Sequence, residues 1–213
     1  MNQKIYAKTF LWLCLGLLIT FATGFYVCTN ENMIYNIFST SAYWIIFIIE
    51  LVLVIFLSAR IQKMKYGTAI ACYTLYSFVS GLTFASVFVL FDIASIMLIF
   101  GITALVFAVF GAIGYFTKAD LSKLSMILLM GLITIIIMTL INIFIGNSTF
   151  DIIICIIGIL IFVGYIAYDV QKIKILSNYM DENKLPVYGA FQLYLDFINL
   201  FLYLIRLLGN RKD

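Results

Sequence analysis

Two aspartates in or beside long apolar segments are the residues of this chain best suited to chemistry. Asp169 directly follows the apolar segment 152–168, and Asp196 lies inside the segment 187–208. Carboxylates within a membrane are costly, face a protein interior or a water-filled cavity, and are functional candidates. If the two segments form neighbouring helices, the two carboxyl groups share one low-dielectric site and cannot both ionise easily. The pair is therefore expected to titrate as a unit. The chemistry indicated is binding of protons, and of cations that prefer oxygen ligands.

A polar stripe runs along the last apolar segment. Its members are spaced by four, three, four and three positions, which on a helix share one face: Gln192, Asp196, Asn199, Tyr203 and Arg206. Asp196 falls ~15 Å along this helix, about halfway through a ~30 Å hydrocarbon core. Such a stripe is expected to face protein rather than lipid.

The elements that must position these residues are transmembrane helices. The 213 residues are 65% hydrophobic and 11% charged, which excludes a soluble globular domain. We predict an all-α polytopic membrane protein with a single transmembrane domain over residues 1–213. The polar stripe favours a last helix that is central and surrounded by the other six. The seven predicted spans cover about residues 9–28, 43–58, 66–90, 94–116, 124–145, 152–168 and 187–208.

Helix packing can also be anticipated from short loops and small residues. Loops of a few residues join most spans, so consecutive helices are expected to be antiparallel neighbours. Small residues at helical spacing, Ser77 with Gly81 and Gly111 with Gly114, predict close helix approach.

Basic residues alternate between the loops and indicate an orientation. Lysine and arginine gather at the N-terminus and after the second, fourth and sixth spans, whereas the intervening loops carry Glu31, Asp92 and Asp151. The positive-inside rule then predicts a cytoplasmic N-terminus. Seven spans place the basic C-terminal tail on the far side, against the rule. Either the tail is tolerated there or the last segment is re-entrant, and we favour a spanning helix.

Three further charged residues need an explanation. Arg60, at the inner end of the second span, lies at the expected depth of Asp169 and can neutralise the aspartates in one conformation. Glu50 lies near mid-membrane, and Arg206 can snorkel outward or reach back towards Glu50. The alternative is that these charges form static ion pairs that fix helix register. Asp169 can also act as a helix-end partner of Lys172.

Other residue types limit the possible functions. The chain has no histidine, so proton sensing near neutral pH must come from perturbed carboxylates. The net charge of +3 is spread among short loops and forms no nucleic-acid-binding patch. The cysteines lie in or at the edge of apolar segments without a CxxC pair, which argues against a metal or redox role: Cys14, Cys28, Cys72 and Cys155.

Four sequence blocks carry a resemblance to a known family. They are Tyr168-Asp169-Val170-Gln171, residues 193–201, residues 76–83 and residues 107–122. In these blocks the chain resembles the Bax-inhibitor family, the transmembrane Bax-inhibitor-motif proteins, and the similarity extends over nearly the whole chain. Many members have threonine where this chain has Val170, which removes a possible hydroxyl contact but leaves Asp169 and Gln171 in place.

The resemblance implies a fold and a function. It implies seven helices with the last one at the centre, in a bacterial member that acts as a pH-sensitive calcium leak gated by Asp169 and Asp196. In that picture Arg60 exchanges into the aspartate pair when the pathway opens, and Glu50 with Arg206 lines or braces the outer part. The expected partners are the lipid bilayer, calcium ions and protons. No cofactor is expected, and the protein is expected to be a monomer. The expected location is the plasma membrane of a bacterium, and the alternative is an internal eukaryotic membrane.

Competing functions follow from the same residues. Gln192, Asp196 and Asn199 can offer calcium a weak, transient site, which suits a passive leak, and Asp169 can contribute to it. Two aspartates on neighbouring helices are also typical of intramembrane aspartyl proteases, but Leu195-Asp196 lacks the Gly-x-Gly-Asp pattern, so we predict no enzymatic activity. A third reading is an interaction protein that regulates stress or cell death without conduction. Leak and proton-coupled exchange are not separated by these residues.

Overall fold

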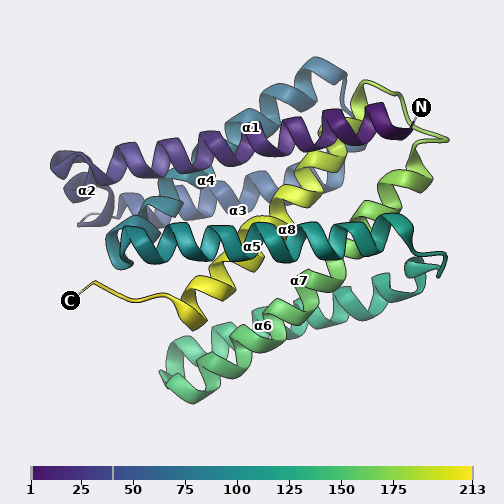
Figure 1. The fold of residues 1–213 in the computed structure, drawn as a ribbon. Helices are drawn as coiled ribbons and strands as arrows, with labels where there is room; N and C mark the ends of the chain where they lie inside the picture. The colour runs from purple at the N-terminus through teal and green to yellow at the C-terminus, as the bar shows by residue number, and fades with distance from the viewer. Residues whose placement is uncertain (1, 40, 213) are drawn as a thin grey trace. The chain divides into compact units, whose positions relative to one another are not determined.

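The computed structural model describes residues 2–39 and 41–212 (Figure 1). Within these residues the chain forms eight α-helices and two 3₁₀ helices. The α-helices are α1 (Asn2–Cys28), α2 (Glu31–Phe38), α3 (Ala42–Arg60), α4 (Tyr66–Leu90), α5 (Ile93–Phe116), α6 (Ser125–Ile145), α7 (Ser148–Leu176) and α8 (Lys184–Leu208). The 3₁₀ helices are η1 (Ile61–Lys63) and η2 (Leu121–Leu124).

The predicted class of fold is confirmed. Among the described residues, seven helices are long and apolar enough to cross a membrane, and these are all the α-helices except α2. The last of them, α8, runs unbroken over 25 residues. At 1.5 Å per residue it is about 37 Å long, which suits a spanning helix rather than a re-entrant segment.

The helices reach beyond the predicted spans in two places that matter for the site and its surroundings. The region after the first span contains α2, which begins where the Asn30 side chain accepts a hydrogen bond from Met33 N (3.2 Å), and its eight residues are too few to register as a span. Helix α7 continues past the predicted end at residue 168 to Leu176. The prediction took Asp169 as the end of the apolar segment, but its carboxyl group is buried in protein, so the helix continues through it.

A tight connection joins α6 to α7. Gly146 adopts a left-handed conformation with φ 65°, which glycine tolerates without a Cβ penalty. The next residue, Asn147, caps α7 because its side chain accepts a hydrogen bond from Phe150 N at 2.9 Å. This turn places Asp151 in the first turn of α7.

The chain divides into two compact units. Unit 1 comprises residues 1–92, 179–194 and 211–213, and unit 2 comprises residues 93–178 and 195–210. Helix α8 therefore gives its first half to unit 1 and its second half to unit 2. The single transmembrane domain and the central position of the last helix stay predictions.

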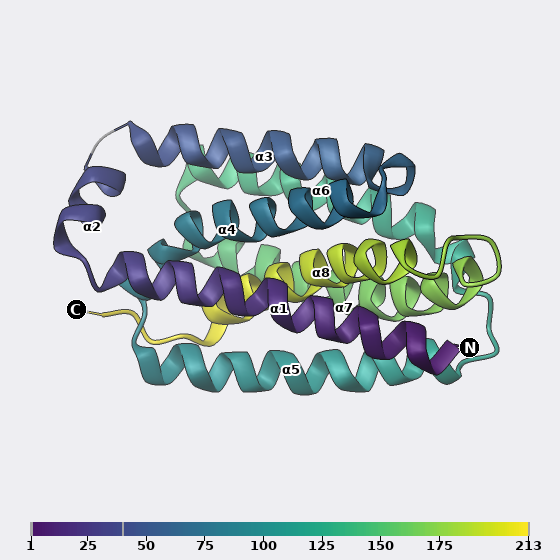
Figure 2. The same ribbon diagram turned by 90° about the horizontal axis from the view of Figure 1, so that it is seen from above.

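In unit 1, α1 and α4 pack closely and in parallel (Figure 2). A Cβ atom added at Gly16 would lie 2.0 Å from Tyr73 Oη, and one added at Gly24 would lie 3.1 Å from Gly81 O. Residue numbers therefore rise together along the two helices. A Cβ atom at Gly81 would lie 2.8 Å from Thr20 O, so the predicted close approach at this residue is confirmed.

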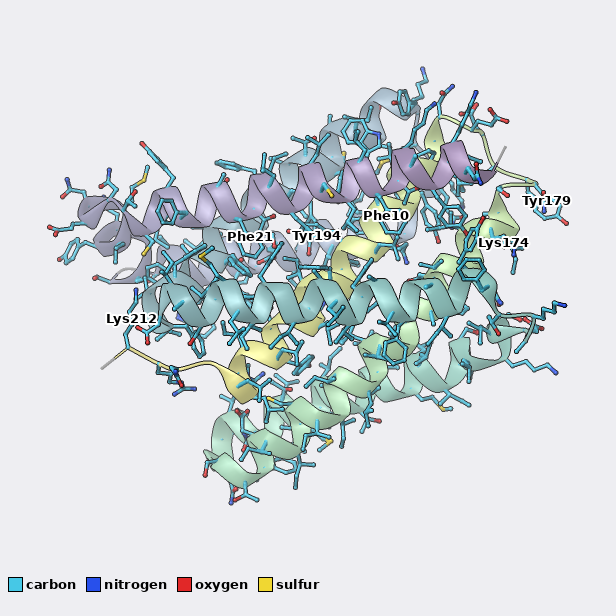
Figure 3. All side chains as sticks on the ribbon, in the orientation of Figure 1. Phe10, Phe21, Lys174, Tyr179, Tyr194 and Lys212 are labelled. Carbon is cyan, nitrogen blue, oxygen red and sulfur yellow. The ribbon has the colours of Figure 1, made fainter. Side chains whose placement is uncertain are left out.

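A tyrosine fastens the first half of α8 to this helix pair. Tyr194, labelled in Figure 3, has its hydroxyl 2.6 Å from Thr20 Oγ1. Thr20 Oγ1 also lies 2.9 Å from Ser77 O and 3.0 Å from Gly16 O, and either hydroxyl can donate in the contact between Thr20 and Tyr194. The Tyr194 ring also meets the rings of Tyr73 and Tyr76 edge-on, at centroid distances of 5.9 and 5.7 Å.

The C-terminal tail lies at the far end of unit 1 from the N-terminus (Figure 1). Lys212 N donates to Leu90 O at 2.9 Å, and Lys212 Nζ donates to Phe88 O at 2.7 Å. The Arg211 guanidinium lies 6.0 Å from the centroid of the Phe91 ring. The basic tail therefore has local partners at the end of α4, which is how a spanning last helix accommodates its positive charges.

In unit 2, α7 makes close contacts through small residues. A Cβ atom at Gly114 of α5 would lie 2.2 Å from Ala167 O of α7, so these two backbones touch as predicted. A Cβ atom at Gly158 of α7 would lie 2.8 Å from the Tyr203 ring of α8. Glycine therefore lets α7 approach both of these neighbours, which fixes the helices that carry the two aspartates.

Two glycine substitutions in α5 test this packing. We expect Gly114→Ala to destabilise the protein by about 1–3 kcal/mol, because the new methyl group overlaps a backbone oxygen that cannot move alone. We expect Gly101→Ala, the matched control, to be neutral or to stabilise by up to about 1 kcal/mol, because nothing lies within 4 Å of the added atom and alanine favours a helix. Reversible unfolding in mixed detergent micelles measures both. Equal stabilities would contradict the close contact.

Candidate functional site

Asp169 and Asp196 lie in the interior of unit 2. Asp169, on α7, has 3% of its surface exposed, and Asp196, on the second half of α8, has 4% exposed. The two carboxyl groups interact electrostatically with each other. The structure therefore brings two carboxyl groups from α7 and α8 together in an apolar interior.

The cation nearest to these carboxyl groups within unit 2 comes from the same helix as Asp169. Lys172 Nζ lies 3.7 Å from Asp169 Oδ1, one helical turn further along α7. The same ammonium group lies 5.4 Å from the centroid of the Tyr168 ring. Arg60, the cation predicted to neutralise the aspartates, is an exposed residue at the end of α3 in unit 1.

One oxygen of each aspartate has no hydrogen bond from the described residues. These atoms are Asp169 Oδ1 and Asp196 Oδ2, and both are buried. The Lys172 ammonium, at 3.7 Å from Asp169 Oδ1, is beyond hydrogen-bond length. A buried oxygen without a hydrogen bond costs about 1–3 kcal/mol, and more when it is charged. A proton or a cation bound here would relieve this cost, because either one interacts directly with the carboxyl oxygens.

The other polar residues of the predicted site have local surroundings of their own. Glu50, half-buried on α3 in unit 1, accepts a hydrogen bond from Thr83 Oγ1 at 2.6 Å. Asn199 Nδ2 donates to Leu195 O of its own helix at 2.7 Å. Gln192 is half-buried in the first half of α8. The polar stripe therefore falls into two parts, because Gln192 belongs to unit 1 and the residues from Asp196 onward belong to unit 2.

One of the two expectations for Arg206, a contact with Glu50, was wrong. Arg206 Nη2 pairs with Asp151 Oδ1 rather than with Glu50. The same guanidinium lies 5.8 Å from the centroid of the Tyr203 ring. The physical reason is that α7 and α8 follow one another in the chain and run in opposite directions, so the last turn of α8 lies beside the first turn of α7.

A signal for this ion pair was present in the sequence. Asp151 opens the sixth span and Arg206 closes the seventh, so two antiparallel neighbours place them at one end. Asn142 also reaches this carboxylate, with Nδ2 at 3.5 Å from Asp151 Oδ1. A reading of loop charges alone assigned Asp151 to the loop and missed its partner.

A resident metal centre finds little support in these side chains. Within residues 2–39 and 41–212, no group of three or more histidine, cysteine or acidic side chains is placed to hold a metal ion. Calcium takes about six to eight oxygen ligands. The carboxylate oxygens of two aspartates are fewer than this number. An ion at this site would take its remaining ligands from water and backbone carbonyls, which favours brief contact over storage.

These features define the class of protein. Seven long apolar helices, with the carboxyl groups of the last two buried inside the protein, make this an integral multi-pass membrane protein.

Comparison with known proteins gives the family. The model of the family described as "Inhibitor of apoptosis-promoting Bax1" matches residues 2–213, and the chain belongs to this Bax-inhibitor family. A protein of Borreliella burgdorferi is 38% identical over 100% of this chain and 94% of its own length. The "Inner membrane protein YbhL" of Escherichia coli is 37% identical over 99% of this chain and 93% of its own length. A protein of Rickettsia prowazekii is 35% identical over 99% of this chain and 91% of its own length.

The Arg206 pairing can be tested with a double-mutant cycle. We expect Arg206→Gln and Asp151→Asn to show a coupling energy of up to about 1 kcal/mol, because both side chains are partly exposed and water screens the pair. The matched cycle of Arg206→Gln with Glu50→Gln should be additive, because Glu50 has its partner in Thr83. Unfolding in detergent measures both cycles. Coupling to Glu50 in place of Asp151 would contradict the assignment.

A second measurement addresses Asp120, which lies in the loop before η2 and outside the spanning segments. Hydrogen bonds from the Ser122 hydroxyl (2.5 Å) and Ser122 N (3.0 Å) lower the pKa of Asp120 below its ordinary value. The resulting contribution to loop stability is therefore present above the ordinary aspartate pKa of about 4. It is lost as the pH falls through the lower, folded-state pKa.

The expected result is a change on removal of the Ser122 hydroxyl. In Ser122→Ala the pKa of Asp120 should rise towards its ordinary value, because only the backbone hydrogen bond remains. The control Ser125→Ala leaves both hydrogen bonds in place and should not change this pKa. Titration of the Asp120 carboxyl carbon by NMR measures it. An unchanged value in Ser122→Ala would show that the hydroxyl contributes nothing.

Proposed function

We propose that this protein is a pH-sensitive calcium leak channel in which Asp169 and Asp196 form the gate and the pH sensor. The observation that supports the proposal is the burial of these two carboxyl groups beside each other, each with one oxygen that lacks a hydrogen bond. Buried polar atoms are normally hydrogen-bonded, so these exceptions call for an explanation, and a site that exchanges protons or cations supplies one.

The proposed gate works through charge. When both aspartates are ionised they repel each other and attract a divalent cation to the site near the end of α7 and the middle of α8. When one carboxyl group is protonated, it donates a hydrogen bond to the other, the pair loses one of its two negative charges, and the site closes. Lys172, at 3.7 Å from Asp169 Oδ1, supplies positive charge beside the site. The exchange of Arg60 into the pair on opening remains part of the proposal.

The permeating ion is proposed to be calcium. Carboxylate oxygens, together with backbone carbonyls and water, match the hard-cation ligands that calcium prefers. With only two carboxylates the contact is weak, and a leak requires that an ion leave as readily as it enters. Protons act as the regulators of the same site, because they compete with the cation for the same oxygens.

The membrane and the orientation belong to the proposal as well. The Escherichia coli relative is named an inner membrane protein, which supports the plasma membrane of a bacterium as the location. The basic residues before α1 and after α3, α5 and α7 support a cytoplasmic N-terminus. The gate at Asp169, near the end of α7, would then face the cytoplasm.

A proteolytic role finds less support in the surroundings of Asp196. Leu193 and Leu195 stand where the Gly-x-Gly-Asp pattern has the glycines that let a substrate backbone approach an intramembrane catalytic aspartate. Leu193 and Tyr194 are fully buried. We therefore assign the aspartates to proton and cation binding without a catalytic step.

The deciding experiment is calcium flux into proteoliposomes. We expect wild-type flux to change between about pH 5 and about pH 8, the range in which a perturbed carboxyl pair can titrate. In Asp169→Asn/Asp196→Asn the ratio of flux at the two ends of this range should fall to about one, because the proton-binding groups of the site are gone.

The control is Asp120→Asn, an identical change at an exposed carboxylate in a loop. It should keep the wild-type pH dependence. Absence of calcium flux from the wild type at every pH would overturn the channel. Undiminished pH dependence in the double variant would leave a channel but remove the aspartates as its sensor.

A further inference from the structure

The Gln171 side chain joins α7 to the loop between α5 and η2. Gln171 Oε1 accepts a hydrogen bond from Leu121 N at 2.8 Å, and Gln171 Nε2 donates to Ala119 O at 2.8 Å. Both ends of one amide therefore bind the loop backbone on either side of Asp120. Gln171 is 9% exposed, so water competes little for these bonds.

The loop is already shaped to present these two backbone groups. Asp120 Oδ1 accepts from Ser122 N at 3.0 Å and from Ser122 Oγ at 2.5 Å, and Thr117 Oγ1 accepts from Ala119 N at 3.2 Å. These short-range hydrogen bonds fold the loop on itself. Because the loop is already folded, it loses little conformational entropy when the Gln171 amide binds its backbone, and the bound state is favoured.

A second contact lies near the end of α7. Lys174 Nζ donates to Tyr115 O at 3.3 Å and lies 5.4 Å from the centroid of the Tyr115 ring. Lys174, the residue that donates this hydrogen bond, is exposed and is labelled in Figure 3. Because it binds the end of α5 rather than the loop itself, it offers a matched comparison for the Gln171 contact.

Asp169 lies within a short stretch of α7 that is held at several consecutive points. Ala167 O touches α5 at Gly114, and a Cβ atom added at Gly111 would lie 3.8 Å from Val170 Cγ2. Gln171 then binds the loop, two residues after Asp169. The backbone that carries Asp169 is thus fixed from the α5 side by helix contact and from the loop side by one amide.

We propose that Gln171 is a positioning residue that couples the loop of residues 117–122 to the protonation site at Asp169. This inference rests on the proposed function. Docking of the loop holds the end of α7 in the arrangement that keeps Asp169 buried, and release of the loop lets that end move and water enter. The titratable groups that face Asp169 within unit 2 are Asp196 on α8 and Lys172 and Tyr165 on α7.

Two variants break the contact from opposite sides. Gln171→Met removes both hydrogen bonds and keeps the length of the side chain. Leu121→Pro removes the donor on the loop, at a position where the chain tolerates proline. Leu121 is the first residue of η2, and Asp120 before it is extended with φ −78° and ψ 101°. The control is Lys174→Met, which removes the neighbouring contact to Tyr115 and leaves the Gln171 amide bonds in place.

The experiment combines hydrogen exchange with flux on full-length protein. In Gln171→Met, we expect amide exchange of residues 117–124 to be about tenfold faster than in the wild type, because both hydrogen bonds between the Gln171 side chain and the loop backbone are lost. The ratio between the highest and lowest calcium flux over about pH 5 to about pH 8 should fall at least about fivefold, a typical coupling between sites. Leu121→Pro should lower the flux ratio in the same direction but less, and Lys174→Met should change neither quantity.

Each result separates the coupling from the channel itself. Unchanged exchange in Gln171→Met overturns the docking role of Gln171. Faster exchange with an unchanged flux ratio shows a merely structural contact and overturns the coupling. A wild type without pH-dependent flux overturns the proposed function and the coupling with it, whatever the exchange data show. Faster exchange with a reduced flux ratio in both variants supports the coupling.

Discussion

A polar side chain inside an apolar helix has to find its partners within the protein, because the hydrocarbon core of a membrane supplies none. The described structure follows this constraint closely. Thr20, Ser77 and Tyr194 form one closed set in unit 1, and Arg206 with Asp151 forms another in unit 2. Among residues 2–39 and 41–212, the buried side-chain oxygens without a hydrogen bond are on Asp169 and Asp196. This departure from complete pairing is the observation on which the proposed proton- and cation-binding site rests.

Close helix packing makes this arrangement possible. Glycine at residues 16 and 81 lets α1 approach α4, and glycine at residues 114 and 158 lets α7 approach α5 and α8. In a membrane such contacts matter because lipid is as apolar as the helix surfaces, so van der Waals contact and hydrogen bonds must favour association. The same contacts hold the stretch of α7 around Asp169. Packing and chemistry thus depend on the same few turns of helix.

Much of the fold was predictable because length and hydropathy are local properties. Seven apolar segments predicted seven helices, and glycine spacing predicted close approach at Gly81 and Gly114. The end of α7 was missed because Asp169 was taken to mark the limit of the apolar segment, although a buried carboxyl group can lie within a helix. Helix α2 was missed because eight residues with an asparagine cap give no transmembrane signal.

The candidate site, like the fold, could be predicted from the sequence only in part. The sequence by itself determined that Asp169 and Asp196 are costly within a membrane and need a protein environment, because charge and hydropathy are properties of residues. The tertiary structure decided the partners: Asp151 for Arg206, Thr83 for Glu50, and the backbone of residues 119 and 121 for Gln171. A partner is fixed by how helices pack and where a loop returns, and these depend on contacts between residues far apart in the chain.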